Sequence, residues 1–179
     1  MPGAEASLPA GDFSAWLRAM RSALAGGPGM AVACGECRGC CTSAYYIKVR
    51  ATETDALAHI PPEQLGDSPG DPPGTRLMGY DARGHCPMLR DGNCTIYPHR
   101  PDTCRTYDCR VFTAAGMDAG TGRDVINERV ARWRFEYPHA VDSRNNARCA
   151  RPPRSCASTR CASRTATFPR ARPTSRCSR

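Results

Sequence analysis

In the stretch Cys34-Gly35-Glu36-Cys37-Arg38-Gly39-Cys40-Cys41, four thiols fall within eight residues. Gaps of two residues separate the first three thiols, so their sulfurs can turn toward one centre. Two glycines lie between them, where a loop needs positive φ or a close backbone approach. Buried cysteine packs as a small hydrophobe and does not need this spacing, whereas thiolates select zinc, copper(I) and iron–sulfur clusters. The stretch therefore predicts a soft-metal site.

A second group of four cysteines follows within residues 86–109. Eight thiols suffice for two four-thiolate sites, or for one site with spare cysteines. Adjacent Cys40 and Cys41 cannot both bind one ion without strain, so one of them is expected to serve a second site. We expect the domain to fold around metal held by both groups. The predicted ligands are Cys34, Cys37, Cys40, Cys41, Cys86, Cys94, Cys104 and Cys109.

The spacing of the thiols bears on which metal is bound. The run Cys34-x2-Cys37-x2-Cys40 is similar to the first three ligands of a ferredoxin, although Cys41 then follows at once. The fourth ligand would have to come from the second group, which contains Cys86-Pro87. A zinc ribbon would show a second Cys-x2-Cys, and this chain has none. The spacing slightly favours a four-iron four-sulfur cluster, and zinc stays open as the alternative.

The composition predicts one small, loop-rich domain. The chain has 179 residues, with 12 Cys, 16 Gly and 16 Pro, and a domain with a thin core is often stabilised by metals or disulfides. We see neither a basic segment followed by an apolar one, as in a signal peptide, nor an apolar run long enough for a membrane span. We therefore expect a cytoplasmic protein with reduced thiols and no membrane partner. A disulfide-stapled exported domain is the alternative.

The basic character of the chain belongs to its end. Residues 145–179 carry nine Arg and no acid, whereas residues 1–144 carry 15 Arg and one Lys against 17 Asp plus Glu. The tail also has no Val, Ile, Leu or Met, so we expect it to be disordered. Two interpretations are an Arg-rich nucleic-acid-binding arm and a frameshift near residue 145. Nucleic-acid binding would rest on this tail alone and is not expected of the domain. Its four cysteines are not counted among the ligands.

The periodicity of the remaining chain predicts an irregular α+β domain over residues 12–144, with about three helices, short strands and long loops. Asp12 is a candidate cap for a helix over Phe13–Leu24, whose apolar stripe includes Leu24. Asp91-Gly92 predicts a hairpin turn that brings Cys86 and Cys94 together. The other expectations are a disordered segment at 1–11, strands at 45–49 and 77–80, helices at 55–60, from 101 and at 123–137, and loops at 61–76 and 114–122.

Other side chains near the second thiol group have open roles. His85 and His99 could each replace a thiolate, but their placement favours exposed loop histidines. Tyr97 and Tyr107 are expected to pack around the metal. Three arginines could stabilise thiolate charge, bind an anionic partner or simply lie at the surface. They are Arg100, Arg105 and Arg110.

The motifs together resemble the bacterial CxxCxxCC cysteine-cluster family. The likeness spans about residues 30–112 and rests on the first thiol stretch, Cys86-Pro87, Gly92-x-Cys94-x-Ile96-Tyr97 and Arg100-Pro101-x-x-Cys104-Arg105-x-Tyr107-x-Cys109. That family is described as a zinc- or iron-chelating domain, some members are labelled iron–sulfur oxidoreductases, and flagellin lysine N-methylases contain a similar domain. The resemblance implies a metal-binding role for all eight thiols and leaves the metal and the reaction open.

Two classes of function follow. The first is a metal- or cluster-binding protein with a redox or electron-transfer role and a redox partner protein. The second is an enzyme, either a lysine methylase or a cluster-dependent oxidoreductase. Against an enzyme, the sequence has no Gly-x-Gly-x-x-Gly after a strand, and Gly116-x3-Gly120-x-Gly122 follows no strong strand. The sequence therefore favours the metal-binding protein and leaves catalysis undecided.

Overall fold

The computed structural model describes residues 6–149. Within that range lie six α-helices and seven short strands in three small sheets, which confirms the predicted α+β class. In chain order the elements are β1 (Leu8–Asp12), α1 (Phe13–Leu24), η1 (Gly39–Cys41), β2 (Ile47–Val49), α2 (Thr54–His59), η2 (Pro62–Gln64), β3 (Leu65–Asp67), β4 (Arg76–Met78), β5 (Leu89–Arg90), β6 (Asn93–Cys94), η3 (Tyr97–His99), α3 (Asp102–Thr106), α4 (Arg110–Ala115), α5 (Asp124–Arg132), β7 (Trp133–Glu136) and α6 (Ala140–Cys149), where η marks a 3₁₀ helix.

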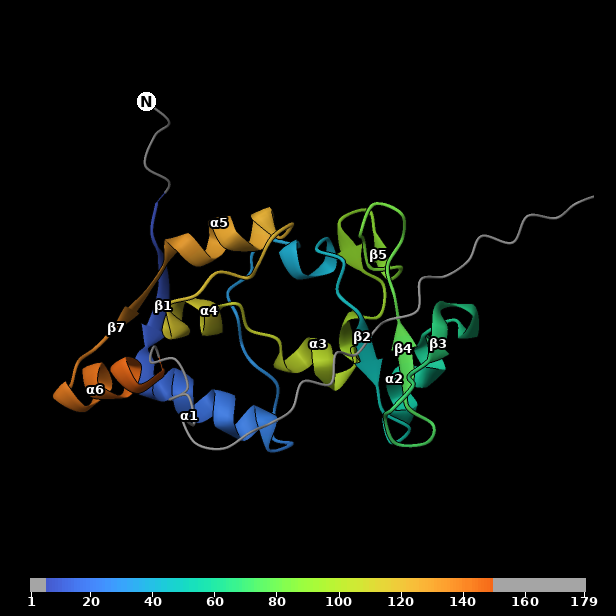
Figure 1. Cartoon of the computed structure of the whole chain (residues 1–179), viewed down its shortest axis with the longest axis horizontal. Helices are drawn as coiled ribbons and strands as arrows, with labels where there is room; N and C mark the ends of the chain where they lie inside the picture. Colours follow the sequence, from blue (N-terminus) through green and yellow to red (C-terminus); the bar gives the residue numbers. More distant parts are fainter. Residues whose placement is uncertain (1–5, 150–179) are drawn as a thin grey trace, which may run out of the picture.

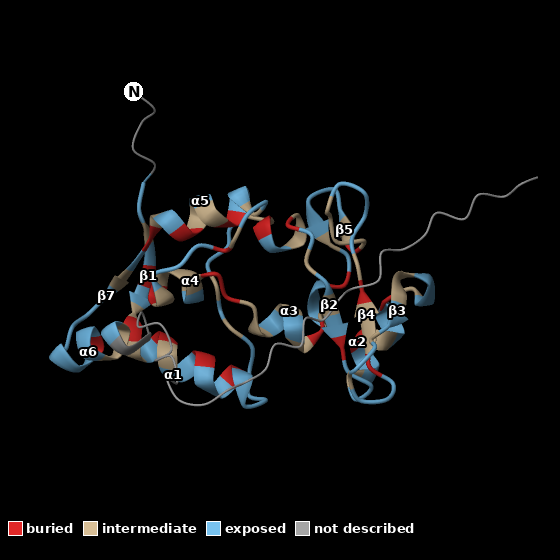
Figure 2. Ribbon diagram, viewed as in Figure 1, coloured by how far each residue is buried: buried red, intermediate tan, exposed pale blue. Residues whose placement is uncertain are grey.

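Two halves can be followed in Figure 1. Helices α1, α4, α5 and α6 gather with β1 and β7 in one half, and the sheet formed by β2, β3 and β4 lies with α2 in the other. The short helix α3 lies between them. Buried residues, red in Figure 2, occur in both halves, so each half has apolar packing of its own.

The first long helix forms as predicted. The Asp12 carboxylate accepts a hydrogen bond from the Ala15 amide at 2.6 Å, which satisfies a free N–H of the first turn. Phe13, Trp16 and Met20 are buried in a cluster with Ala114 and Phe135, so the predicted stripe is the packed face. Leu24 is the exception, because it lies at the last turn and is 72% exposed.

Strand β1 corrects two expectations. Residues 8–12 were predicted to lie mainly in a disordered segment, but they pair in parallel with β7, with Leu8 opposite Trp133. The helix predicted for residues 123–137 ends at Arg132, and Trp133 takes up an extended conformation in β7. Trp133 is 1% exposed, so burial of this ring in the core accompanies the change from helix to strand.

The other half is a three-stranded antiparallel sheet in the order β2-β4-β3. Strands β2 and β4 lie within or beside the segments predicted as strands, and they are shorter than expected. Residues 61–76, predicted as a loop, contain η2 and β3. Leu65 of β3 pairs with Met78, which is 1% exposed, so this segment helps to cover the core of the sheet.

The predicted hairpin and the helix near residue 101 are both present. Asp91 and Gly92 have φ of 48° and 73° and connect β5 to β6, as a tight hairpin turn requires. Helix α3 begins directly after Pro101. Cys94 follows the turn, Cys104 lies in the helix, and both line one cavity.

The described part of the chain ends in one more helix than was expected. Helix α6 reaches Cys149, five residues into the segment that was predicted to be disordered from residue 145. The expected disorder and the frameshift interpretation otherwise concern residues 150–179, which lie outside the described part. Residues 1–5 lie outside it as well.

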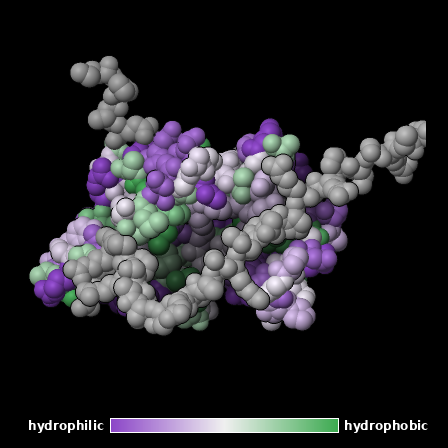
Figure 3. Space-filling model, in the orientation of Figure 1, coloured by the Kyte–Doolittle hydropathy of each residue, from purple (hydrophilic) through white to green (hydrophobic). Residues whose placement is uncertain are grey.

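The surface offers few clues of its own. The face shown in Figure 3 is largely hydrophilic, with hydrophobic residues gathered to the left of its centre. In residues 6–149 we find no helix with the length and hydropathy needed to cross a membrane.

Candidate metal centre

One cavity brings together thiols from three separate segments of the chain. It has a volume of about 480 Å³ and lies between the first cysteine loop, the β5–β6 hairpin and α3. Apolar and aromatic side chains, among them Val32, Met78 and Met88, form much of its wall. Seven of the eight predicted ligands line it: Cys34, Cys37, Cys40, Cys41, Cys86, Cys94 and Cys104.

The two glycines of the first loop allow its shape. Gly35 has a φ of 55°, in the left-handed region that favours glycine. A Cβ at Gly39 would lie 3.1 Å from Ile126 Cγ1 of α5, a tight contact that glycine avoids. The Gly39 amide in turn approaches Cys37 Sγ at 3.4 Å. Both expectations for these glycines are thus met, one by conformation and one by close approach.

Backbone hydrogen bonds join the first loop to the second thiol group. The Cys86 amide donates to the Cys41 carbonyl at 2.7 Å. Arg38 extends across the gap and donates to the Gly92 carbonyl in the hairpin turn and to Asn93 Oδ1. Hydrogen bonds that do not involve any thiol therefore hold the hairpin with Cys94 against the loop.

Helix α3 is fixed to the rest of the molecule on both sides. Thr103 Oγ1 donates to the Lys48 carbonyl of β2 at 2.7 Å. The Met30 amide donates to the Arg105 carbonyl at 2.8 Å, and a Cβ at Gly29 would lie 2.7 Å from that carbonyl. These contacts hold Cys104 at the cavity wall.

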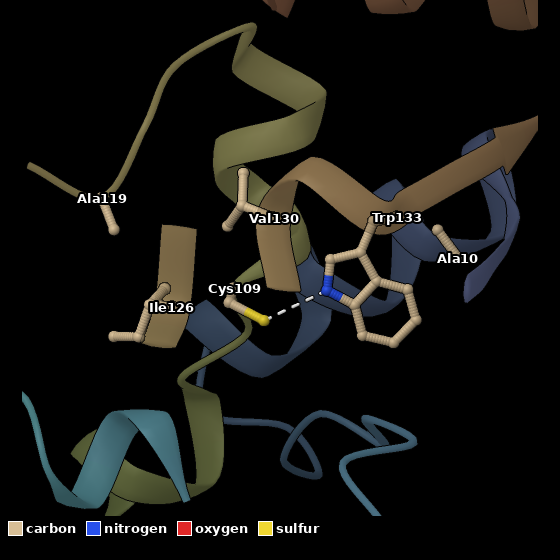
Figure 4. Close-up of a cluster of buried hydrophobic side chains, with 6 residues drawn as sticks. All are labelled: Ala10, Cys109, Ala119, Ile126, Val130 and Trp133. Carbon is tan, nitrogen blue, oxygen red and sulfur yellow. Dashed lines mark hydrogen bonds between the residues drawn. The ribbon is translucent and has the colours of Figure 1, made fainter. Parts of the chain in front are cut away.

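Cys109 is placed differently from the other seven thiols. It is 8% exposed, belongs to a buried apolar cluster and is not among the described residues that line the cavity. Figure 4 shows the indole N–H of Trp133 pointing to its sulfur, at an Nε1–Sγ distance of 3.2 Å. Its thiol is nevertheless close enough to Cys34 and Cys37 for them to raise its pKa, although burial is the main cause.

Burial of so many thiols resists their ionisation. Desolvation, helped by Cys86, Cys40 and Cys94, raises the pKa of Cys104 to about 12. Desolvation also raises the pKa of Cys34 and of Cys86. Clustered thiolates of this kind need a positive charge to hold them together, and a metal centre supplies it.

Cys40 is the exception. Its pKa is lowered to about 7, chiefly by a hydrogen bond with the Cys41 thiol, whose sulfur lies 3.8 Å away. The same contact raises the pKa of Cys41. The adjacent pair therefore consists of one thiol that ionises readily and one that serves as its donor.

The comparisons with known proteins identify a family for this chain. A model of the CxxCxxCC family, described as a "Putative zinc- or iron-chelating domain", matches residues 33–157, more than two thirds of the chain. This chain belongs to the CxxCxxCC family. Its domain is thus a metal-chelating one. Neither a curated protein nor a solved structure matches the chain.

Tyrosines surround the cavity of this CxxCxxCC domain as expected. Tyr97 and Tyr107 both line it. The Tyr107 hydroxyl lies 3.4 Å from that of Tyr45, and burial raises the pKa of Tyr107. Tyr97 is more open than a packing residue, since it is 60% exposed.

The three arginines have three different roles. Arg100 lines the cavity, lies over the Tyr97 ring at 3.7 Å and helps to lower the pKa of Cys40. Arg105 donates to the Arg100 carbonyl outside the cavity. Arg110 is a structural residue that forms a buried ion pair with Asp108 at 2.7 Å. Of the roles left open for these arginines, stabilisation of thiolate charge is therefore supported by position for Arg100 alone.

The histidines do not join the thiols. Neither His85 nor His99 is among the described residues on the cavity wall. His99 contacts the carboxylate of Asp55 and stacks on His59 instead. Sequence reasoning missed this group, although Asp55 and His59 stand four residues apart on one helix, a spacing that places two side chains on the same face.

Proposed function

We propose that this CxxCxxCC domain holds an iron–sulfur cluster in the cysteine-lined cavity and passes single electrons to a redox partner protein in a reducing compartment. The observation that carries the proposal is the convergence of seven thiols from three segments on one cavity. Thiolates are the usual ligands of such clusters. When bound, the cluster would supply reversible one-electron chemistry.

The spread of the sulfurs supports a cluster over a single zinc ion. Four thiolates at about 2.3 Å from zinc lie about 3.8 Å from one another. The Cys40 and Cys41 sulfurs are 3.8 Å apart. However, within residues 6–149 no three cysteine sulfurs all lie within 4.8 Å of one another. The thiols would have to move closer together to hold one tetrahedral ion, which favours the larger cubane in this proposal.

The thiols divide into two neighbourhoods, which supports roles for all eight. Besides the larger effects of Cys40 and of burial, Cys86 and Cys104 help to raise the pKa of Cys41. Besides burial, Cys86, Cys40 and Cys94 help to raise the pKa of Cys104. Cys109 is acted on by Cys34 and Cys37. We propose these two sets as the ligand pools, with Cys40 between them.

The open side of the cavity suits electron transfer. Cys34 and Cys40 are exposed, and Tyr46 and Tyr97 on the cavity wall are each 60% exposed. A partner docking over these residues would approach the thiol-held centre closely. Much of the remaining wall is apolar, which limits the access of water.

Anaerobic purification of the full chain, followed by a visible spectrum and by iron, zinc and sulfide analysis, tests the proposal. We expect a brown protein that absorbs broadly near ~400 nm, contains iron and acid-labile sulfide, and is reduced and reoxidised reversibly in one-electron steps. A colourless protein holding only zinc would overturn the cluster. A cluster that cannot be reversibly reduced would overturn the electron-transfer role.

A pair of variants assigns the metal to the cavity. Cys86→Ser should lower the iron and sulfide content strongly, because serine is a poor ligand for a soft metal. Cys161→Ser is the matched control, since it removes a tail cysteine that lies outside the proposed ligand set. Equal iron loss in both variants would show that the cavity is not the site.

A further inference from the structure

A second group of potential ligands lies apart from the cysteine cavity. Asp55, His59 and His99 each offer a ligand atom within 4.8 Å of the others, and in the described chain no other set of three does so. None of them is among the described residues that line the cavity. The group is therefore a separate feature of the surface.

Two elements that are distant in sequence build this group. Asp55 and His59 stand four residues apart on α2, and His99 ends η3 across from them. His99 Nδ1 lies 2.9 Å and 3.1 Å from the two carboxylate oxygens of Asp55. His59 Nδ1 lies 3.6 Å from one of them and 2.8 Å from the Asp55 carbonyl. Both rings therefore turn the same nitrogen toward Asp55.

The two imidazoles are also stacked. Their centroids are 3.5 Å apart and their planes differ by 5°. The group thus offers two nitrogens and a negative oxygen at one point.

We propose that Asp55, His59 and His99 form a surface site for a borderline divalent transition-metal ion such as Zn²⁺. Nitrogen and oxygen ligands at about 2.0–2.2 Å from a tetrahedral zinc ion are separated from each other by about 3.3–3.5 Å. The observed separations of 2.9 Å and 3.6 Å lie on either side of that value. To bind one ion, the two rings would have to tilt out of their parallel stack and exchange their hydrogen bonds to Asp55 for bonds to the metal.

The exposure of the group leaves room for the rest of the coordination. The side chains of Asp55, His59 and His99 are 60%, 43% and 36% exposed, so water can supply the remaining positions. Imidazole and carboxylate suit zinc, nickel and copper(II) better than iron–sulfur clusters. The site would therefore select a different metal from the thiol cavity.

Metal at this site would also act on the cavity wall. The ion would join α2 to η3, and η3 is followed directly by Arg100, which lines the cavity together with Tyr97. Fixing His99 would hold this segment in the position seen here. The inference does not depend on which metal the thiols bind.

Zinc titration of the full, metal-loaded protein tests the proposal, with the ring-proton NMR signals of its histidines as the readout. The chain has four histidines, His59, His85, His99 and His139. We expect one added Zn²⁺ per chain to shift the signals of His59 and His99 together and to leave those of His85 and His139 in place. Parallel shifts of all four signals, or no shift at all, would overturn the site.

Variants measured by competition with a chromophoric chelator complete the test. Asp55→Asn and His99→Ala should each weaken zinc binding by about 10- to 100-fold. His139→Ala, which removes an exposed histidine elsewhere, should bind zinc as the parent does. Unchanged affinity in Asp55→Asn would contradict the proposal. The iron and sulfide contents of the same samples should not change, so the experiment distinguishes a loss of this zinc site from a loss of the thiol-held centre.

Discussion

At the scale of single residues, the Cys40–Cys41 pair gives the metal-free protein a distinctive reactivity. Thiolate is the reactive form of cysteine. Cys40 has a pKa of about 7, so alkylation by iodoacetamide should rise as the pH passes through that value. Cys104, with a pKa raised to about 12, should stay unlabelled over the same range. Peptide mass spectrometry of protein labelled at stepped pH measures both.

The donor thiol provides the control for this prediction. Cys41→Ala removes the hydrogen bond that favours the Cys40 thiolate, so labelling of Cys40 should move to higher pH. A labelling curve that stays in place would show that Cys41 does not set the pKa of Cys40.

A variant of Trp133 tests whether Cys109, which does not line the cavity, is nevertheless a ligand of the proposed cluster. The indole N–H of Trp133 donates to the Cys109 sulfur, and a hydrogen bond to a ligand sulfur favours the reduced, more negative cluster. Trp133→Phe should therefore lower the reduction potential, by an amount on the order of tens of millivolts, since about 59 mV corresponds to a tenfold change for one electron. Spectroelectrochemistry measures the shift.

Trp16→Phe is the matched control, because Trp16 donates to Asp108 Oδ2 and not to a sulfur. It should leave the potential near that of the parent while costing stability. An unchanged potential in Trp133→Phe would show that Cys109 is not bound to the cluster.

At the scale of elements, a buried polar group joins the helical half to the loop before the first cysteine. Asp108 is 3% exposed and accepts from both Trp16 of α1 and Arg110 of α4. Arg110 also donates to the carbonyls of Ala10 and Ala31. The network fixes the direction in which the chain leaves α1 and enters the metal-binding loop.

Breaking this network should destabilise the fold. Asp108→Asn leaves the buried Arg110 without its counter-charge, and losing one partner of a buried pair costs about 3–5 kcal/mol. Urea unfolding measures the loss. Asp67→Asn is the control, since its ion pair with Arg76 is at the surface and should contribute less than about 1 kcal/mol. Equal losses in the two variants would contradict the structural role of Asp108.

The elements also show what the sequence could predict. Helix α1 and the hairpin turn depend on neighbours in the chain, so the Asp12 cap and Asp91-Gly92 were sufficient signals. Strand β1 depends on β7, more than a hundred residues away, and no local pattern indicates that pairing. For the same reason helix periodicity was extended past Arg132, although Trp133 leaves the helix to pack in the core.

The candidate site also combines features that depend on neighbours in the chain with features that depend on tertiary packing. The spacing of Cys34, Cys37 and Cys40 predicted a loop whose thiols face one centre, and the structure places them on one cavity. Spacing did not distinguish Cys109, whose burial against Trp133 is a tertiary property. It also did not reveal the Asp55–His59–His99 group, because His99 reaches the other two only through the packing of η3 on α2.

At the scale of the whole molecule, the two halves should depend on metal to different degrees. The helical half has buried clusters around Phe13 and Trp133 that contain only one of the eight thiols. Cys34 and Cys37 lie in a stretch with little regular secondary structure, and their positions rest on a few backbone hydrogen bonds. Metal that binds only the folded chain stabilises it by an amount that grows with the logarithm of the affinity, and the segments that the metal joins receive that stabilisation.

Hydrogen exchange followed by mass spectrometry should resolve this difference. On removal of the metal, peptides covering residues 34–41 and 86–104 should exchange much faster, while α1, β1 and β7 stay protected, because their burial does not involve the cavity. Readdition of the metal to the reduced protein should restore the slow exchange. Uniformly faster exchange would instead mean that the metal supports the whole fold as one cooperative unit, and unchanged exchange would mean that the cavity is formed without it.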